Sequence, residues 1–282
     1  MSKKASWDIV IEPKSKWFDL KVRELIQYKD LLFLFVRRDL VAQYKQTILG
    51  PIWYFIQPLL TTLTYVVIFG NVAGLSTDGL PKLLFYLSGV TAWRYFSECL
   101  TKTSDTFIKN AEIFGKVYFP RAIMPLSVTI TNLVTFGVQL LLFLGFYIYY
   151  YSQGAAIAPT REMYLFPVLL VAMMLLGLGF GLVLSALTTK YRDLKFLLTF
   201  GVQLLMYATP VIYPISSLPE KYRIYILLNP MSSIIETFRT ITLGSGTINY
   251  SNLLYSGIFS VLIFLFGLMV FNRVEKNFMD TV

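Results

Sequence analysis

The stretch Arg38-Asp39-Leu40, Tyr44-Lys45-Gln46-Thr47, Leu49-Gly50-Pro51 and Trp53 decides how the chain is organised. It joins a basic, partly amphipathic segment to the first hydrophobic span within about one helical turn. A simple membrane anchor does not need so ordered a run of polar residues. The stretch therefore predicts a working junction between an N-terminal region and a membrane domain.

Composition places most of the chain in a membrane. Of 282 residues, 56% are hydrophobic and only 15% are charged, whereas a soluble domain carries roughly a quarter charged residues. Residues 1–30 contain no apolar core long enough for a cleavable signal. The chain has no histidine, which is the commonest general base and zinc ligand. Its single cysteine, Cys99, falls inside a hydrophobic span and is interpreted as a packing residue.

Six hydrophobic stretches reach the length of about 20 residues that a bilayer crossing requires. In lipid every backbone polar group needs an internal partner, so each stretch predicts a helix. We therefore expect an all-α polytopic membrane protein with six transmembrane helices. They are expected at residues 52–74, 83–104, 126–150, 164–187, 196–214 and 253–272.

The positions of Lys and Arg predict the orientation of these spans. Nineteen of the 25 Lys and Arg residues fall in one set of flanking segments, and five fall in the opposite set. Positive charge marks the cytoplasmic side, so both termini are expected in the cytoplasm. The net charge of +9 then indicates topology and contact with anionic membrane lipids, not a nucleic-acid partner. Residues 1–51 would form a cytoplasmic, interfacial region, and residues 52–282 the transmembrane domain.

The N-terminal region predicts an amphipathic helix that lies along the cytoplasmic face of the membrane. Trp7 and Trp17 suit the level of the lipid headgroups. An ordinary helix packed on a soluble partner is the alternative. The residues that recur at helical spacing are Phe18, Val22, Leu25, Ile26 and Lys29.

The cytoplasmic loop after the second span predicts a short helix of mixed character. It begins at Thr106-Phe107-Ile108-Lys109-Asn110, and Gly115 and Pro120 interrupt it. A short helix displayed by a membrane domain suits docking into a groove on a soluble partner. A solvated connector is the alternative.

The external segment 215–252 predicts two short helices, near residues 217–228 and 230–243. Asn229-Pro230 is a helix N-cap followed by proline, and Gly244 stands at the C-cap position. Both helices are too short to cross a bilayer and too apolar to lie freely in water. We therefore expect a re-entrant pair that dips into the outer leaflet. It would form either an external gate or a structural lid.

Two features inside the spans concern contacts between helices. Arg94 and Glu98 lie four residues apart in the second span, where charges should face each other, another span or a water-filled path. A structural ion pair and a pore-lining role both remain open. In the fourth span, a stripe of small residues predicts close helix packing; it consists of Gly177, Gly181 and Ser185.

The chain lacks the usual signatures of an enzyme. It contains no Gly-x-x-x-x-Gly-Lys-Ser/Thr loop, nucleophile elbow, paired-carboxylate cluster or metal-ligand spacing. We therefore expect a non-enzymatic chain without a cofactor of its own. It would supply a membrane path and docking surfaces, and depend on another subunit for energy.

Several blocks resemble the permease subunit of ABC-2-type exporters, in the branch that moves O-antigen, capsular or teichoic-acid polysaccharides. Their order and spacing cover nearly the whole chain. Gln43, where a basic residue is frequent, and Met279, where a small residue is usual, depart from the pattern without changing the class. Besides the opening stretch, extended to Pro58, the blocks are Tyr118-Phe119-Pro120-Arg121 with Pro125, Tyr191-Arg192-Asp193, Pro210-Val211-Ile212-Tyr213, Asn229-Pro230 with Arg239, and Glu275-Lys276-Asn277-Phe278-Met279-Asp280.

The resemblance implies a homodimer in the bacterial cytoplasmic (inner) membrane. It implies two copies of a separate ATPase subunit, which would bind ATP and Mg. It also implies a coupling helix after the second span and a further ATPase contact on the interfacial helix. The residues expected to couple to the ATPase are Thr106, Phe107, Lys109, Asn110, Lys116, Arg38, Asp39 and Lys45.

Candidates for the pore and its gate are aromatic, charged or helix-capping residues. A sliding sugar polymer needs flat apolar faces, scattered hydroxyls and weak, repeated contacts. Aromatic residues are also common in membrane proteins without such a role. The candidates are Trp53, Tyr54, Arg94, Glu98, Tyr207, Tyr213, Asn229, Pro230 and Arg239.

Together these features predict the conduit of an ATP-driven exporter of a lipid-linked polysaccharide. Export of a small amphiphile, drug or lipid by the same architecture is one alternative. A membrane-embedded glycosyl- or acyltransferase is another, and the missing acid/base residues argue against it.

Overall fold

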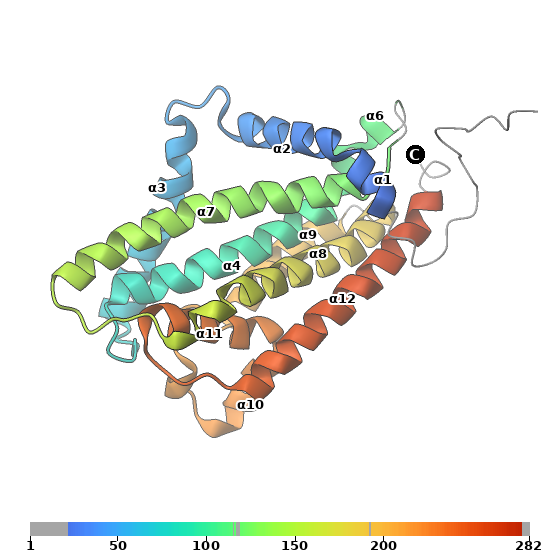
Figure 1. The fold of residues 1–282 in the computed structure, drawn as a ribbon. Helices are drawn as coiled ribbons and strands as arrows, with labels where there is room; N and C mark the ends of the chain where they lie inside the picture. The colour runs from blue at the N-terminus through green and yellow to red at the C-terminus, as the bar shows by residue number, and fades with distance from the viewer. Residues whose placement is uncertain (1–21, 115, 117–118, 192, 278–282) are drawn as a thin grey trace, which may run out of the picture.

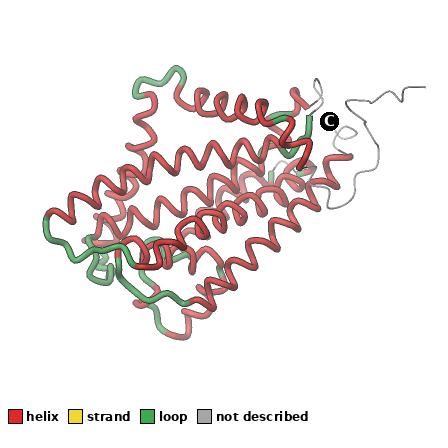
Figure 2. The backbone as a smooth tube through the Cα atoms, in the orientation of Figure 1, coloured by secondary structure: helices red, strands yellow, loops and turns green. Residues whose placement is uncertain are grey.

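The computed structural model describes residues 22–114, 116, 119–191 and 193–277. Figure 1 shows a bundle of long helices with shorter helices at both ends. In Figure 2 the regular structure of this part of the chain is helical throughout, so the predicted all-α class is confirmed for it. Some residues used in the predictions lie outside the described residues: Trp7, Trp17, Phe18, Gly115, Tyr118, Arg192 and Phe278-Met279-Asp280.

Two helices precede the first span: α1 (Val22–Gln27) and α2 (Lys29–Tyr44). Helix α2 packs along α7 (Ile123–Ser152) and meets the first span at a sharp corner (Figure 1). Gln46 (φ 66°) and Gly50 (φ 52°) have left-handed backbone conformations in this corner. Pro51 then starts the next helix, where a missing amide hydrogen is tolerated. The polar stretch is therefore a bent joint between two helices.

Four segments are long and apolar enough to cross a membrane: Gly50–Val72, Ile123–Ser152, Arg161–Thr188 and Tyr250–Arg273. They match the first, third, fourth and sixth predicted spans. The elements that form them are η1 (Gly50–Ile52), α3 (Trp53–Tyr65), the π-helix η2 (Val66–Val72), α7, η3 (Arg161–Leu165), α8 (Phe166–Lys190) and α12 (Tyr250–Asn277).

The second and fifth predicted spans are helices of a different kind. Helix α4 (Lys82–Ser104) has 23 residues but carries Arg94, Glu98 and Lys102. Helix α9 (Leu194–Tyr207) has 14 residues, about 21 Å of helix, which is less than the thickness of a bilayer core. The predicted span 196–214 is too long as a helix, because the chain turns after Tyr207 and Pro210 and Pro214 prevent its continuation.

Glycines hold α4, α8 and α12 close together in the core. A Cβ atom on Gly177 would lie 2.7 Å from the Cβ of Cys99, and one on Gly181 would lie 2.5 Å from the Cβ of Thr103. On the other face of α8, a Cβ on Gly179 would lie 2.7 Å from a backbone nitrogen of α12. The predicted small-residue stripe is thus confirmed as a packing surface. Cys99 is fully buried in it, as a packing residue should be.

Short helices lie at both ends of the bundle. At one end, α5 (Thr106–Lys109) and α6 (Ala111–Phe114) share an apolar cluster with Phe35 of α2 and Phe271 of α12. At the other end lie η4 (Ile215–Ser217), α10 (Glu220–Leu228) and α11 (Pro230–Leu243). The loop before α4 reaches this second end, where the Ser245 hydroxyl donates to the Asp78 carbonyl (3.2 Å). The segments predicted as cytoplasmic therefore lie at one end of the helix bundle, and those predicted as external lie at the other end.

The boundaries of α11 follow the predicted caps. The Asn229 side chain accepts a hydrogen bond from the Met231 amide (3.1 Å), Pro230 is the first helical residue, and Gly244 (φ 79°) ends the helix. Helix α10 starts at Glu220, later than the predicted residue 217. The reason is a 3₁₀ turn at Ile215–Ser217, followed by Pro219.

Candidate translocation path

A hollow of about 470 Å³ lies beside α3 and α4, close to the corner after α2. We call it the polar hollow. Four predicted pore residues come together in it: Trp53, Tyr54, Arg94 and Glu98. Its full lining is Gln43, Gly50, Trp53, Tyr54, Gln57, Arg94, Glu98, Lys102 and Thr135.

Glu98 is at the centre of the charges in the polar hollow. Its carboxylate accepts hydrogen bonds from Arg94 Nε (2.7 Å) and from Lys102 Nζ (2.8 Å). The expected ion pair between Arg94 and Glu98 is therefore confirmed and extended by a second cation. Since the same side chains line a hollow, an ion pair and a place on a polar path are compatible roles for them.

Neighbouring helices supply partners for both cations. Arg94 donates to the side-chain oxygen of Gln57 on α3, and Lys102 donates to that of Asn132 on α7 (3.0 Å). Charged groups inside a membrane are costly unless they are paired or solvated. The row Gln57, Arg94, Glu98, Lys102 and Asn132, which we call the polar strip, thus fixes α4 between α3 and α7.

A second hollow, of about 540 Å³, adjoins the polar hollow, because Gln43 and Lys102 line both. We call it the junction hollow. Five predicted coupling residues meet there, from α2 and from the loop after α4: Arg38, Asp39, Thr106, Lys109 and Asn110. The remaining lining is Ala42, Ile113, Val128 and Thr131.

Three further coupling candidates lie outside both hollows. Phe107 is fully buried, and its ring stacks on Phe271 at 4.7 Å between centroids, which favours a packing role within the subunit. Lys45 and Lys116 are exposed. Their contact with a partner stays a prediction.

An ion pair links the loop after α4 to α9. The buried carboxylate of Asp105 accepts from Lys195 Nζ (2.9 Å) and lies 3.3 Å from Lys109 Nζ. Lys195 belongs to α9, so a displacement of α5 would act directly on the start of that helix. Sequence reasoning missed both Asp105 and Lys195, because nothing in the local pattern joins residues so far apart.

The predicted gate residues brace the other end of the bundle and line neither of these hollows. The Asn229 side chain donates to the Thr209 hydroxyl (2.7 Å), and the Tyr213 hydroxyl donates to the carbonyl of Tyr207 (3.2 Å). The first bond joins the turn after α9 to the start of α11, and the second closes that turn onto the end of α9. Their role in gating stays a prediction.

Arg239 is the most firmly held of the gate candidates. Its guanidinium lies 3.8 Å from the centroid of the Phe85 ring, and it donates to the carbonyl of Pro210 (3.0 Å) and to Glu236 (3.1 Å). The side chain is almost fully buried. It therefore ties α11 to α4 and to the turn after α9.

Three members of the polar strip were missed in the sequence: Gln57, Lys102 and Asn132. Lys102 could have been found, because it follows Glu98 at the same four-residue spacing that singled out Arg94. Gln57 and Asn132 are single polar residues in apolar helices. Their sequence signal is weak until a partner is known.

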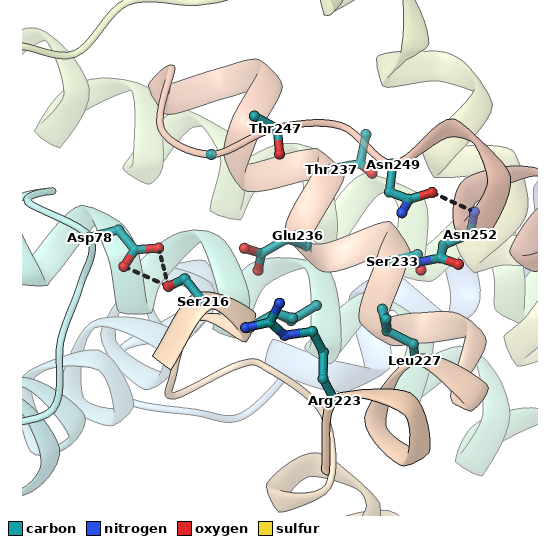
Figure 3. Close-up of a pocket in the computed structure, with 12 residues that line it drawn as sticks. Asp78, Ser216, Arg223, Leu227, Ser233, Glu236, Thr237, Thr247, Asn249 and Asn252 are labelled. Carbon is teal, nitrogen blue, oxygen red and sulfur yellow. Dashed lines mark hydrogen bonds between the residues drawn. The ribbon is translucent and has the colours of Figure 1, made fainter. Parts of the chain in front are cut away.

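A third hollow, of about 290 Å³, lies at the end of the bundle that holds α10 and α11 (Figure 3). We call it the outer pocket. None of its residues was predicted as a site. Its polar lining includes Asp78, Ser216, Arg223, Ser233, Glu236 and Asn252.

Several apolar helices with a polar strip fixed among them are typical of the membrane subunit of a transporter. The chain belongs to the ABC-2 type transporter family, which matches residues 30–243. The family resemblance drawn from the sequence blocks is thereby confirmed.

Curated relatives match over most of their own length. The O-antigen export system permease protein RfbA of Klebsiella pneumoniae is 27% identical over 251 residues, 89% of this chain and 94% of that protein. The protein of the same name from Myxococcus xanthus is 33% identical over 224 residues, 78% of this chain and 83% of that protein. The polysialic acid transport protein KpsM of Escherichia coli is 21% identical over 252 residues, 88% of this chain and 93% of that protein.

Proposed function

We propose that this chain is the permease subunit of an ATP-driven exporter that moves a lipid-linked polysaccharide out of the cytoplasm. The observation that carries the proposal is similarity along nearly the whole chain to permeases named for O-antigen export. The polar strip supports it, because a hydrophilic polymer needs fixed polar groups inside the membrane.

The chain would cross the bacterial inner membrane six times, with both termini in the cytoplasm. Helix α4 would make the second crossing, since Arg94, Glu98 and Lys102 in its second half have partners on α3, α4 and α7. Helix α9 and the turn after it would make the fifth. The collection of Lys-rich and Arg-rich segments at one end of the bundle supports this orientation.

Two copies would form a homodimer and bind two copies of a separate ATPase, which holds ATP and Mg. Helices α3 and α9 support a dimer because they carry exposed apolar side chains, among them Leu60 (55% exposed) and Phe196 (79% exposed). A second copy and lipid would share these faces. The ATPase would contact the exposed basic residues near the junction hollow, including Lys109 and Lys116.

Helices α10 and α11 would form the re-entrant external gate. Helix α10 leaves Ile224 and Leu228 exposed (67% and 61%), which suits lipid contact in the outer leaflet better than water. Helix α11 is buried against α4, α8 and α12. Opening would therefore move α10 more easily than α11.

The same architecture could export a small amphiphile, drug or lipid. One observation favours this second candidate: hollows of about 470 and 540 Å³ fall in the size range of small-molecule sites. The two candidate functions predict different phenotypes for a cell that lacks this chain.

Removal of the chain from its producing cell separates them. We expect surface polysaccharide to disappear and lipid-linked polymer to accumulate inside the cell, and the wild-type chain to restore export. A partner ATPase whose phosphate-binding lysine is replaced should fail to support this restoration. Unchanged surface polysaccharide together with new sensitivity to amphiphilic drugs would favour the second candidate.

A further inference from the structure

The outer pocket has walls that internal hydrogen bonds hold in place. Figure 3 shows hydrogen bonds between residues of the pocket. The Ser216 hydroxyl lies 2.8 Å from each carboxylate oxygen of Asp78, and the backbone amide of Asn252 donates to the side-chain oxygen of Asn249 (3.1 Å). Glu236 is held from outside the pocket by Arg239 (3.1 Å). The Ser216–Asp78 contact joins η4 to the loop before α4, and the other two contacts fix side chains at the start of α12 and within α11.

Two polar groups of the lining are buried without a hydrogen-bond partner among the described residues. They are the hydroxyl of Ser233 and the Nε of Arg223. Ser233 is only 5% exposed. A buried polar group without a partner is unfavourable, so such groups are normally satisfied by water or by a ligand. Both groups belong to residues that line the outer pocket, so a small side-chain rotation would bring them to a molecule bound there.

The chemistry of the lining fits a neutral molecule with several hydroxyl groups. Asp78 and Glu236 supply acceptors, and Arg223 supplies donors. The Ser233 hydroxyl and the side-chain amide of Asn252 can each donate and accept. A sugar hydroxyl also donates and accepts. Because Arg239 already pairs with Glu236 (3.1 Å), Asp78 and Arg223 leave the lining without an excess of positive charge that would favour an anionic sugar or a phosphate. Ile215 and Leu227 add an apolar wall for the carbon-bound hydrogens of a sugar ring.

The volume of the outer pocket and the charge of its lining limit the kinds of ligand further. A volume of about 290 Å³ is at the lower limit of small-molecule sites, so it suits one sugar unit of a longer chain. A metal ion fits less well, because the described residues contain no group of three or more His, Cys, Asp or Glu side chains that could hold one. The guanidinium of Arg223 would also repel a cation.

We propose that the outer pocket binds a neutral sugar unit of the exported polymer, through the Ser233 hydroxyl and the Arg223 guanidinium. The inference rests on the proposed function, because the polymer would reach this end of the bundle as it leaves. Weak binding here would hold the emerging chain and oppose its return. Multi-site transport requires contacts of this weak kind.

Saturation-transfer NMR on the complete permease–ATPase complex in lipid nanodiscs tests the proposal. The probe is the surface polysaccharide of the producing cells, freed of lipid and cut to short oligosaccharides. A sialic acid tetramer and Ca²⁺ are the comparison ligands. We expect saturation of the neutral oligosaccharide, and no competition from either comparison ligand.

Two neighbouring serines give a matched pair of variants. Ser233→Ala should weaken binding about threefold to tenfold, the effect of one hydrogen bond. Ser232→Ala should leave binding unchanged, because Ser232 is at least as buried and its hydroxyl also has no partner in the described part of the chain, but it does not line the pocket. Arg223→Met should weaken binding at least as much as Ser233→Ala, since it removes charged donors.

The outcomes separate this inference from the proposed function. Equal binding by the Ser233→Ala and Ser232→Ala variants would overturn the outer-pocket site, as would competition by Ca²⁺ or by the sialic acid tetramer. Surface polysaccharide on cells with the wild-type chain is measured in parallel. If export continues but binding does not depend on Ser233, the outer-pocket site is wrong and the proposed function stands. If surface polysaccharide persists after removal of the chain, the proposed function itself is wrong.

Discussion

Helices α8 and α3 are both apolar enough to cross a membrane, but they are packed very differently. In the most apolar part of Arg161–Thr188, 56% of the residues are buried, against 11% in Gly50–Val72. Gly177 and Gly181 let α8 approach α4, and Gly179 lets it approach α12. Helix α3 buries only Pro58 and Thr62. Small residues, more than hydrophobicity, therefore decide which helices pack within one subunit.

The difference separates a packed region, formed by α4, α8, α11 and the face of α12 against α8, from a peripheral region, formed by α3 and α9. In the packed region a substitution must move a neighbouring backbone or leave a charge unpaired. In the peripheral region the same substitution meets lipid or a second copy.

Arg239→Leu should cause the largest loss, about 3–5 kcal/mol of unfolding free energy, because it leaves a partner charge uncompensated in a buried place. Glu236 would lose its ion pair, and the carbonyl of Pro210 would lose its donor. Thermal unfolding of the purified protein in detergent measures the loss. Arg239→Lys keeps the positive charge but not the planar guanidinium, so it should restore part of the lost unfolding free energy. A wild-type unfolding temperature for Arg239→Leu would show that this residue does not brace the packed region.

Gly179→Ala should cost about 1–3 kcal/mol, as expected for overpacking between two helices. The added Cβ would lie 2.7 Å from the Phe264 nitrogen, a backbone atom that cannot rotate away. The matched control is Gly201→Ala in α9, where no atom of another described segment lies within 4 Å of the added Cβ. That variant should be neutral or more stable by up to about 1 kcal/mol, since alanine favours helix. Equal effects in α8 and α9 would remove the distinction between the two regions.

Glu98→Gln should cost about 1 kcal/mol, the low end for charged hydrogen bonds, because the site is partly exposed. It leaves Arg94 and Lys102 without their shared anion at the border between the packed and peripheral regions. Export should fall by more than stability does, which surface polysaccharide and thermal unfolding measure together. Glu220→Gln, at an exposed carboxylate on α10, is the control. Normal export by Glu98→Gln would show that the polar strip is structural only.

Lys109→Glu combined with Lys116→Glu should cost less than about 1 kcal/mol, because Lys109 gives up a partly exposed ion pair with Asp105 while Lys195 keeps its own. Both side chains lie at the surface of the end that also holds the junction hollow. Export and co-purification of the ATPase should nevertheless decrease, while the permease still inserts in the membrane. Unchanged export with unchanged partner binding would end the coupling hypothesis for this loop.

Sequence reasoning succeeded where the evidence was local. Asn229-Pro230 and Gly244 predicted α11 to the residue, because caps act through neighbours in the chain. The four-residue spacing of Arg94 and Glu98 predicted their ion pair. The small-residue stripe of α8 predicted a close helix contact, although not that Gly179 would serve a second partner on the opposite face.

It failed where contacts join distant segments. The end of α9 at Tyr207 was missed because the hydrophobic run continues past the point where the backbone turns. The outer pocket was missed because Asp78, Ser216 and Ser233 have nothing in common except their position in the fold. The burial of Phe107 was also unexpected, since its ring partner lies on α12.

The polar strip also has a consequence for the insertion of the protein into the membrane during its synthesis. Arg94, Glu98 and Lys102 make α4 a poor candidate to enter lipid alone. One of its outside partners, Gln57, is synthesised before it, and another, Asn132, after it. We therefore expect the insertion machinery to keep α3 and α4 together until α7 emerges, so that these three helices enter the bilayer as one unit.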